Sequence, residues 1–168
     1  MADKYLKNNN GALKEVEGLT SSSGVSDAGK IPALDSTGRL NENMMPVGLG
    51  ADTAQLISSD SLGAGNYINV WNDSGVFKVR KADATVEGKS ADGFVLAAVA
   101  IGEPALVYFE GRNTQVSGMT PGSVYLSTTA GLGTQTPPSA SGNVVQRLGV
   151  AVSATEVNFE RGTPITLA

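Results

Sequence analysis

The sequence predicts an all-β protein, a small antiparallel β-barrel or sandwich preceded by an extended, mostly irregular N-terminal arm. Gly (21) and Pro (7) together supply about one residue in six of the 168, which is above the usual background. Because Gly permits positive φ and Pro fixes turn corners while neither extends a helix, this excess indicates frequent turns between short strands. After residue 60 the apolar residues occur in short runs separated by turn signals at a spacing of roughly ten residues, which is typical of a small barrel or sandwich.

The arm is expected to span residues 1–60 and the β domain residues 61–168. Apolar residues in the arm are spaced singly, with no sustained helical or strand period. A short helix over Leu13–Leu19 is one option, but Gly11 and Gly18 bracket it and isolated short helices are only marginally stable. The arm is therefore either a flexible linker or a segment that becomes ordered against a partner surface.

The arm contains a weak internal repeat. Asp27–Ile31 and Ser36–Leu40 each hold a small polar pair, a turn Gly, a cation and an aliphatic residue. The pattern predicts two tight turns, each followed by an extended step that offers one aliphatic and one basic side chain. Pro32 favours an extended conformation for Ile31 as well.

The β domain is expected to open with a hairpin. Tyr67–Trp71 and Val76–Arg80 flank the loop Asn72–Gly75. The eight-residue apolar run Phe94–Ile101 is expected to be a strand buried on both faces, and a turn then leads into Ala105–Glu110.

Turn signals also divide the C-terminal part. Thr120–Gly122 has Pro and Gly where a type II turn prefers them, and it precedes Val124–Ser127. Pro137–Gly142 is expected to be a loop outside any ladder, since Pro donates no backbone hydrogen bond. The chain is then expected to form a last hairpin, from the runs Val144–Val152 and Thr155–Glu160.

Composition excludes several functions. Cys and His are both absent, which rules out disulfides, thiolate zinc sites, Cys nucleophiles, Ser-His-Asp triads and His-ligated metals within this sequence. The formal charge of -4 argues against a nucleic-acid partner. No apolar run exceeds eight residues, so we expect no membrane segment, and we expect no cofactor or metal. The absence of Cys fits synthesis in a reducing cytoplasm.

Few residues of the β domain suggest chemistry. A glycosidase needs two carboxylates facing across a cleft, and a carbohydrate hydrolase is the last-ranked interpretation. Tyr67 and Trp71 share one face of their strand and are either core residues or, if exposed, a platform for sugar stacking. In the arm, Met44 and Met45 either form an adaptable contact surface or pack locally. The candidate carboxylates are Asp73, Asp83, Glu87, Asp92, Glu103, Glu110, Glu156 and Glu160.

Two parts of the sequence resemble a protein family. The segment Gly29–Asn41, with Met44–Pro46 after it, resembles a phrase of tailed-bacteriophage capsid decoration (cement) or head-fibre proteins. Later strings resemble the C-terminal β domain of the same proteins, and the resemblance extends in order over residues 25–168. These strings are Val79–Ala84, Gly93–Leu96, Gly118–Gly122, Tyr125–Ser127 and Val145–Ala151.

The resemblance implies a non-enzymatic virion protein on the outer surface of the capsid, made in the bacterial host cytoplasm. It implies a homotrimer whose arm binds the major capsid protein while the β domain projects, with no contact to nucleic acid or membrane. The expected apolar anchors of the arm are Ile31, Leu34, Leu40, Met44 and Met45, with Lys30 and Arg39 as polar guides. The alternative within the same resemblance is a tail-fibre or receptor-binding protein, in which Tyr67 and Trp71 face a host saccharide.

Overall fold

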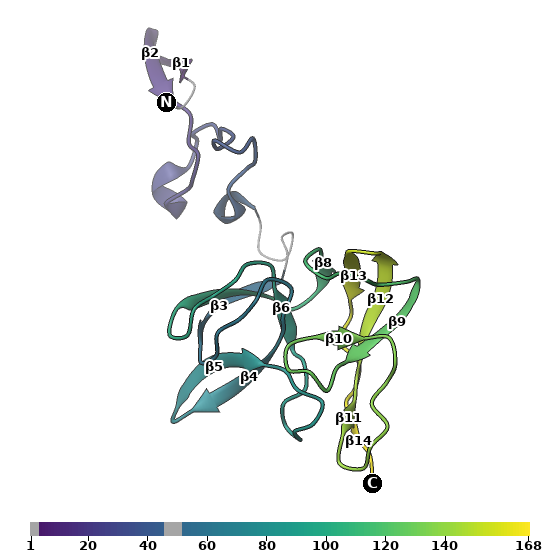
Figure 1. Cartoon of the computed structure of the whole chain (residues 1–168). Helices are drawn as coiled ribbons and strands as arrows, with labels where there is room; N and C mark the ends of the chain where they lie inside the picture. Colours follow the sequence, from purple (N-terminus) through teal and green to yellow (C-terminus); the bar gives the residue numbers. More distant parts are fainter. Residues whose placement is uncertain (1–3, 46–51) are drawn as a thin grey trace. The chain divides into compact units, whose positions relative to one another are not determined.

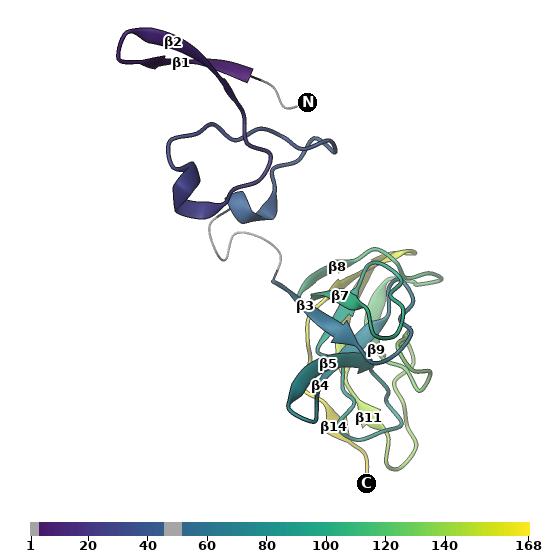
Figure 2. The same ribbon diagram turned by 90° about the vertical axis from the view of Figure 1, so that its left-hand side faces the viewer.

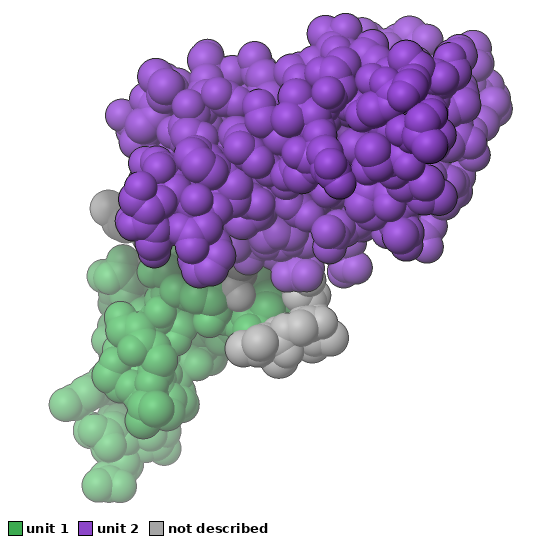
Figure 3. Space-filling view, turned by 90° about the horizontal axis from the view of Figure 1, so that it is seen from below, with its two compact units in different colours: residues 1–50 green, residues 51–168 purple. Residues whose placement is uncertain are grey.

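The protein is all-β, and its chain divides into two compact units (Figure 1). The computed structural model describes residues 4–45 and 52–168. Unit 1 covers Met1–Gly50 and unit 2 covers Ala51–Ala168, and Figure 3 colours them separately. The boundary precedes the expected residue 60, because Thr53–Ser58 form a barrel strand of unit 2. Among the described residues no helix has the length and apolar character needed to cross a membrane.

Unit 1 begins with a hairpin that reaches away from the loops after it (Figure 2). Its strands are β1 (Lys4–Asn9) and β2 (Ala12–Glu17). Asn10 and Gly11 form the turn with φ values of 54° and 88°, as a type I′ turn requires. The Gly11 N–H donates to Oδ1 of Asn8 at 2.8 Å. This hairpin replaces the helix considered over Leu13–Leu19, because the Asn-Gly turn directs the chain back on itself.

Local hydrogen bonds hold the rest of unit 1. The Leu19 N–H donates to the Ile31 carbonyl at 3.0 Å, and the Ala33 N–H donates to the Leu19 carbonyl at 2.6 Å. The Asn43 side chain accepts from the Ser22 N–H at 3.1 Å and donates to the Ser22 carbonyl at 2.9 Å. Two short 3-10 helices lie among these loops, η1 (Gly24–Asp27) and η2 (Glu42–Met44).

Five strands of unit 2 close into a barrel in the order β3-β5-β4-β6-β7. The pair β3 and β5 is parallel, which departs from the expected antiparallel order, and the other pairs are antiparallel. Buried aliphatic side chains fill the interior, including Ile68, Val79 and Val107. The strands are β3 (Thr53–Ser58), β4 (Tyr67–Asp73), β5 (Val76–Lys81), β6 (Gly93–Val95) and β7 (Pro104–Tyr108).

A second, five-stranded antiparallel sheet has the order β10-β9-β12-β13-β8. The last hairpin expected from the sequence is present as β12 and β13. The preceding β11 (Val144–Val145) pairs instead with β14 (Ile165–Thr166) near the C-terminus (Figure 1). The strands of the second sheet are β8 (Gly111–Asn113), β9 (Gly122–Leu126), β10 (Gly133–Thr134), β12 (Arg147–Ser153) and β13 (Glu156–Phe159).

A second core joins the barrel to this sheet. Successive residues of a strand point to opposite faces, so Ile68 enters the barrel while Tyr67 packs on the outside against the second sheet. The rings of Tyr67 and Phe94 lie 5.8 Å and 5.5 Å from the ring of Phe159. Both clusters therefore belong to one continuous β fold.

The run Phe94–Ile101 is not the single buried strand that was expected. Strand β6 ends at Val95, and Ile101 is exposed. Val99 instead forms a separate bridge with Leu62, through N–H to carbonyl bonds of 2.9 Å and 3.0 Å. The run is thus divided: its first residues pair with β4 and β7 in the barrel, and Val99 pairs separately with Leu62.

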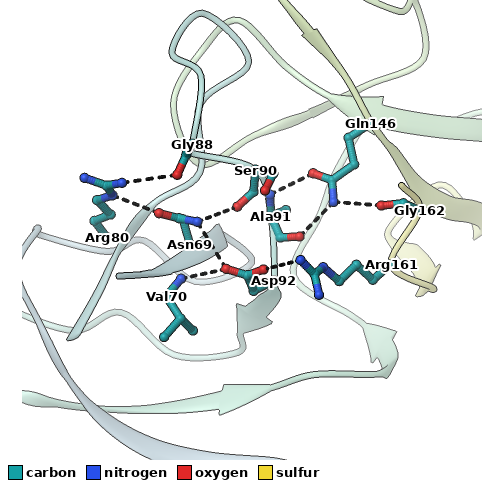
Figure 4. A network of polar contacts seen from close by, with 10 residues as sticks. All are labelled: Asn69, Val70, Arg80, Gly88, Ser90, Ala91, Asp92, Gln146, Arg161 and Gly162. Atoms are coloured by element: carbon teal, nitrogen blue, oxygen red, sulfur yellow. Dashed lines mark hydrogen bonds and ion pairs between the residues drawn. The ribbon is translucent and has the colours of Figure 1, made fainter. Parts of the chain in front are cut away.

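A buried polar network also links the barrel side to the C-terminal segment (Figure 4). Oε1 of Gln146 accepts from the Ala91 N–H at 2.7 Å, and its Nε2 donates to the carbonyls of Ala91 and Gly162 at 2.8 Å and 3.1 Å. Beside it, Arg161 pairs with Asp92 at 2.9 Å. Gln146 is fully buried, so each of these bonds replaces a lost contact with water.

Candidate functional site

The candidate arm residues lie on unit 1, whose described residues form no apolar core. Among the residues of unit 1 whose burial is described, only Gly18 is buried. Four of the five expected anchors have exposed fractions between 42% and 59%, and they are Ile31, Leu34, Leu40 and Met45. Met44 is half-buried, and Pro46 of the family-like segment lies outside the described residues. The arm therefore leaves about half of the surface of these apolar side chains exposed to solvent.

Two of the anchors share a hollow of about 280 Å³ at the base of the hairpin. Ile31 and Leu34 line it together with Tyr5 of the hairpin. The Ile31 N–H donates to the Tyr5 hydroxyl at 3.4 Å, which ties this extended segment to the hairpin. The lining also includes Lys4, Gly18, Pro32 and Ala33.

A second hollow, of about 220 Å³, brings Lys30 and Met44 together. Lys30 is not free at this site, since its Nζ lies 2.7 Å from Oδ1 of Asp27. The expected polar guide is therefore already engaged by a carboxylate of its own turn. Arg39, Leu40 and Met45 are absent from the described linings of both hollows.

Asp27 and Asp35 stabilise the two turns of the arm. The Lys30 hydrogen bond and the Ser23 N–H hold the pKa of Asp27 below its ordinary value. The Thr37 hydroxyl and the backbone N–H groups of Arg39 and Thr37 lower the pKa of Asp35 in the same way. Both groups therefore act as charged acceptors in the turns.

Sequence reasoning missed three exposed apolar side chains of the arm. Leu6 and Leu13 of the hairpin are 67% and 70% exposed, and Val25 in η1 is more exposed still. The turn pair Asn10-Gly11 is the signal that could have located the hairpin and therefore its leucines.

In unit 2 the structure separates the two aromatic candidates. They share the outer face of the barrel, but the second sheet covers Tyr67 completely. Trp71 is half-buried, its Nε1 donates to Oγ of Ser59 at 3.0 Å, and the Arg80 guanidinium lies 4.8 Å from its ring centroid. Of the two candidates only Trp71 is accessible to a saccharide, and the Arg80 guanidinium already lies over its ring.

Half of the candidate carboxylates of unit 2 are engaged in ion pairs. Asp73 lies 2.7 Å from Lys78, and Asp92 lies 2.9 Å from Arg161. Glu156 and Glu160 lie 3.5 Å from Arg112 and Arg147. Over residues 4–45 and 52–168 no three acidic side chains gather in an arrangement that could hold a metal ion.

Comparisons with protein-family models, curated proteins and solved structures give no match to this chain. The arm therefore remains the candidate site on its own chemistry, as an exposed aliphatic surface beside ordered polar turns.

Proposed function

We propose that this chain is a structural virion protein that binds the outside of a bacteriophage capsid through unit 1 and stabilises or decorates the shell. The observation that carries the proposal is the absence of a buried apolar side chain among the residues of unit 1 whose burial is described. Exposed aliphatic side chains gain free energy when a partner surface removes them from water, so a unit of this kind is suited to docking.

The major capsid protein is the proposed partner. The family-like segment Gly29–Asn41 contains Ile31 and Leu34, which line the hollow beside the hairpin, and Leu40, which is exposed. As a homotrimer the protein would present three arms, and linked weak contacts give an avidity far above that of one arm. The net charge of -4 gives no reason to include the genome among the partners.

The test compares two sets of exposed aliphatic residues on full-length protein. We expect the variant Ile31→Asn/Leu34→Asn/Leu40→Asn to lose co-sedimentation with empty shells assembled without this protein. Unit 2 supplies the matched control, Ile101→Asn/Leu132→Asn/Ile165→Asn, whose residues are also exposed and which should sediment like wild type. Equal loss in both variants, or binding retained by the arm variant, would contradict the proposal.

The location of the protein on intact phage particles distinguishes a capsid protein from a tail-fibre or receptor-binding protein. We expect an antibody against unit 2 to label the whole phage head, and shells without the protein to break at lower temperature. Label confined to the tail would favour the receptor-binding alternative.

A further inference from the structure

The two faces of the β1–β2 hairpin differ in chemistry. On one face Lys7 lies directly opposite Lys14, and Tyr5 lies directly opposite Val16. The other face carries the two exposed leucines and the ion pair between Lys4 and Glu15. The first of these is here named the lysine face, and it consists of Tyr5, Lys7, Asn9, Ala12, Lys14 and Val16.

The lysine pair is unfavourable for the isolated hairpin. Side chains directly opposite in an antiparallel pair have Cβ atoms about 5 Å apart, and like charges at such positions destabilise the pairing. In the part of unit 1 that the structure describes, Lys4 has a carboxylate partner, whereas Lys7 and Lys14 have none. A two-stranded hairpin is also only marginally stable by itself. The repulsion is relieved if an anionic group binds between the two ammonium groups.

The lysine face continues into the arm's apolar hollow. Tyr5 belongs to both, because it lies on the lysine face and also lines the hollow with Ile31 and Leu34. A partner seated on those anchors would therefore meet the lysines next. We propose that the lysine face docks on an acidic strip of the partner protein, with carboxylates placed between Lys7 and Lys14. This inference rests on the proposed function and names the chemistry of the capsid surface that the arm recognises.

The test measures binding of full-length protein to empty shells that lack it, at low and at high salt. We expect Lys7→Gln/Lys14→Gln to weaken binding about tenfold at low salt, and the difference from wild type to vanish at about 1 M salt, where charges are screened within roughly 3 Å. Because this change removes a repulsion, the hairpin should become more stable, so unfolding of the hairpin would not explain the loss. The matched control Lys81→Gln/Lys89→Gln makes the same change in net charge within unit 2, away from the hairpin and the hollow, and should bind like wild type.

The outcomes distinguish failure of the proposed function from failure of the lysine-face inference. If wild type itself does not bind the shells, the proposed function fails and this inference fails with it. If wild type binds and Lys7→Gln/Lys14→Gln binds equally well at low salt, only the lysine face is overturned. Loss of binding in Leu6→Asn/Leu13→Asn, with the lysine variant unaffected, would place docking on the opposite face and overturn it as well. Equal weakening of binding in the control variant would show that net charge alone explains the effect, which would also overturn the inference.

Discussion

The hairpins β1–β2 and β4–β5 have similar turns, but they differ in how far their strands are buried. Asn10-Gly11 and Ser74-Gly75 both adopt positive φ at the two turn positions, and in each hairpin the Gly N–H donates to the side chain of an Asn three residues before it. The strands of β4–β5 bury Ile68 and Val79 in the barrel, whereas β1–β2 buries no side chain. Turn chemistry is thus sufficient to define a hairpin, while burial of the strands decides how firmly the protein holds it.

The largest expected effect compares one leucine from each unit. Leu148 is fully buried in the core between barrel and sheet, and Leu34 is exposed in the arm. We expect Leu148→Ala to lower the free energy of unfolding of unit 2 by about 3 kcal/mol, because it opens a cavity, and Leu34→Ala to change it by less than about 0.5 kcal/mol. Denaturant unfolding followed by the fluorescence of Trp71, the single Trp, measures both. A large loss in Leu34→Ala would show that the arm supports the β fold.

The next effect concerns the buried polar link of unit 2. Gln146→Ala removes both groups that satisfy the Ala91 backbone, and it leaves the Gly162 carbonyl without that donor. We expect a loss of about 2 kcal/mol in the free energy of unfolding, since a buried group without a partner retains its full desolvation cost. The exposed Gln55 supplies the control Gln55→Ala, which should be nearly neutral. Equal stability of the two variants would contradict the role given to this network.

The sequence predicted the class of fold because turn residues and short apolar runs are local signals. It missed the barrel strand Thr53–Ser58, whose place depends on pairing with Pro104–Tyr108, far away in the chain. It missed the β1–β2 hairpin because charged residues occupy both faces, so no strand period is visible despite the Asn-Gly turn. It also joined Phe94–Ile101 into one strand, since apolar composition alone does not reveal two separate partners.

The candidate site was predictable to a different extent. The repeat correctly located two turns with exposed aliphatic residues after them, because turn chemistry is local. It did not reveal the Lys30–Asp27 pair or the contact of Tyr5 with Ile31, which depend on how the loops fold back. That the arm binds a partner, and which one, stays a prediction.

A smaller effect concerns the pH dependence of unit 2. Burial raises the pKa of Tyr67 above its ordinary value, and the neighbouring Asn113 offsets only part of the rise. The Asn113 amide bonds to the Gly65 carbonyl and the Gln115 N–H, and the Tyr67 hydroxyl is buried without a hydrogen-bond partner. The unfolded chain therefore releases this proton at a lower pH than the folded one, and stability is lost as the pH rises above about 10.

Removing the Tyr67 hydroxyl measures how much it contributes to the pH dependence of stability. We expect Tyr67→Phe to be as stable as wild type or more stable at neutral pH, because it removes an unpartnered polar group. Its free energy of unfolding should fall less steeply than that of wild type between about pH 8 and about pH 11. Identical pH slopes for the two proteins would argue against a buried, neutral Tyr67.

The smallest effect tests whether unit 1 responds to acid one turn at a time. The pKa of Asp35 is lowered by hydrogen bonds from Thr37 and Arg39, so the turn is stabilised above the ordinary pKa of 3.8 and loses this support as the pH falls through the lower, folded value. We expect the amide NMR signals of Thr37 and Arg39 to shift in that acidic range, while the fluorescence of Trp71 stays constant. Asp35→Asn removes the titrating group, so its signals should not follow the same curve. Because the described residues of unit 1 form no apolar core, we expect this turn to respond to acid separately from the β fold, and a simultaneous change at Trp71 would contradict that independence.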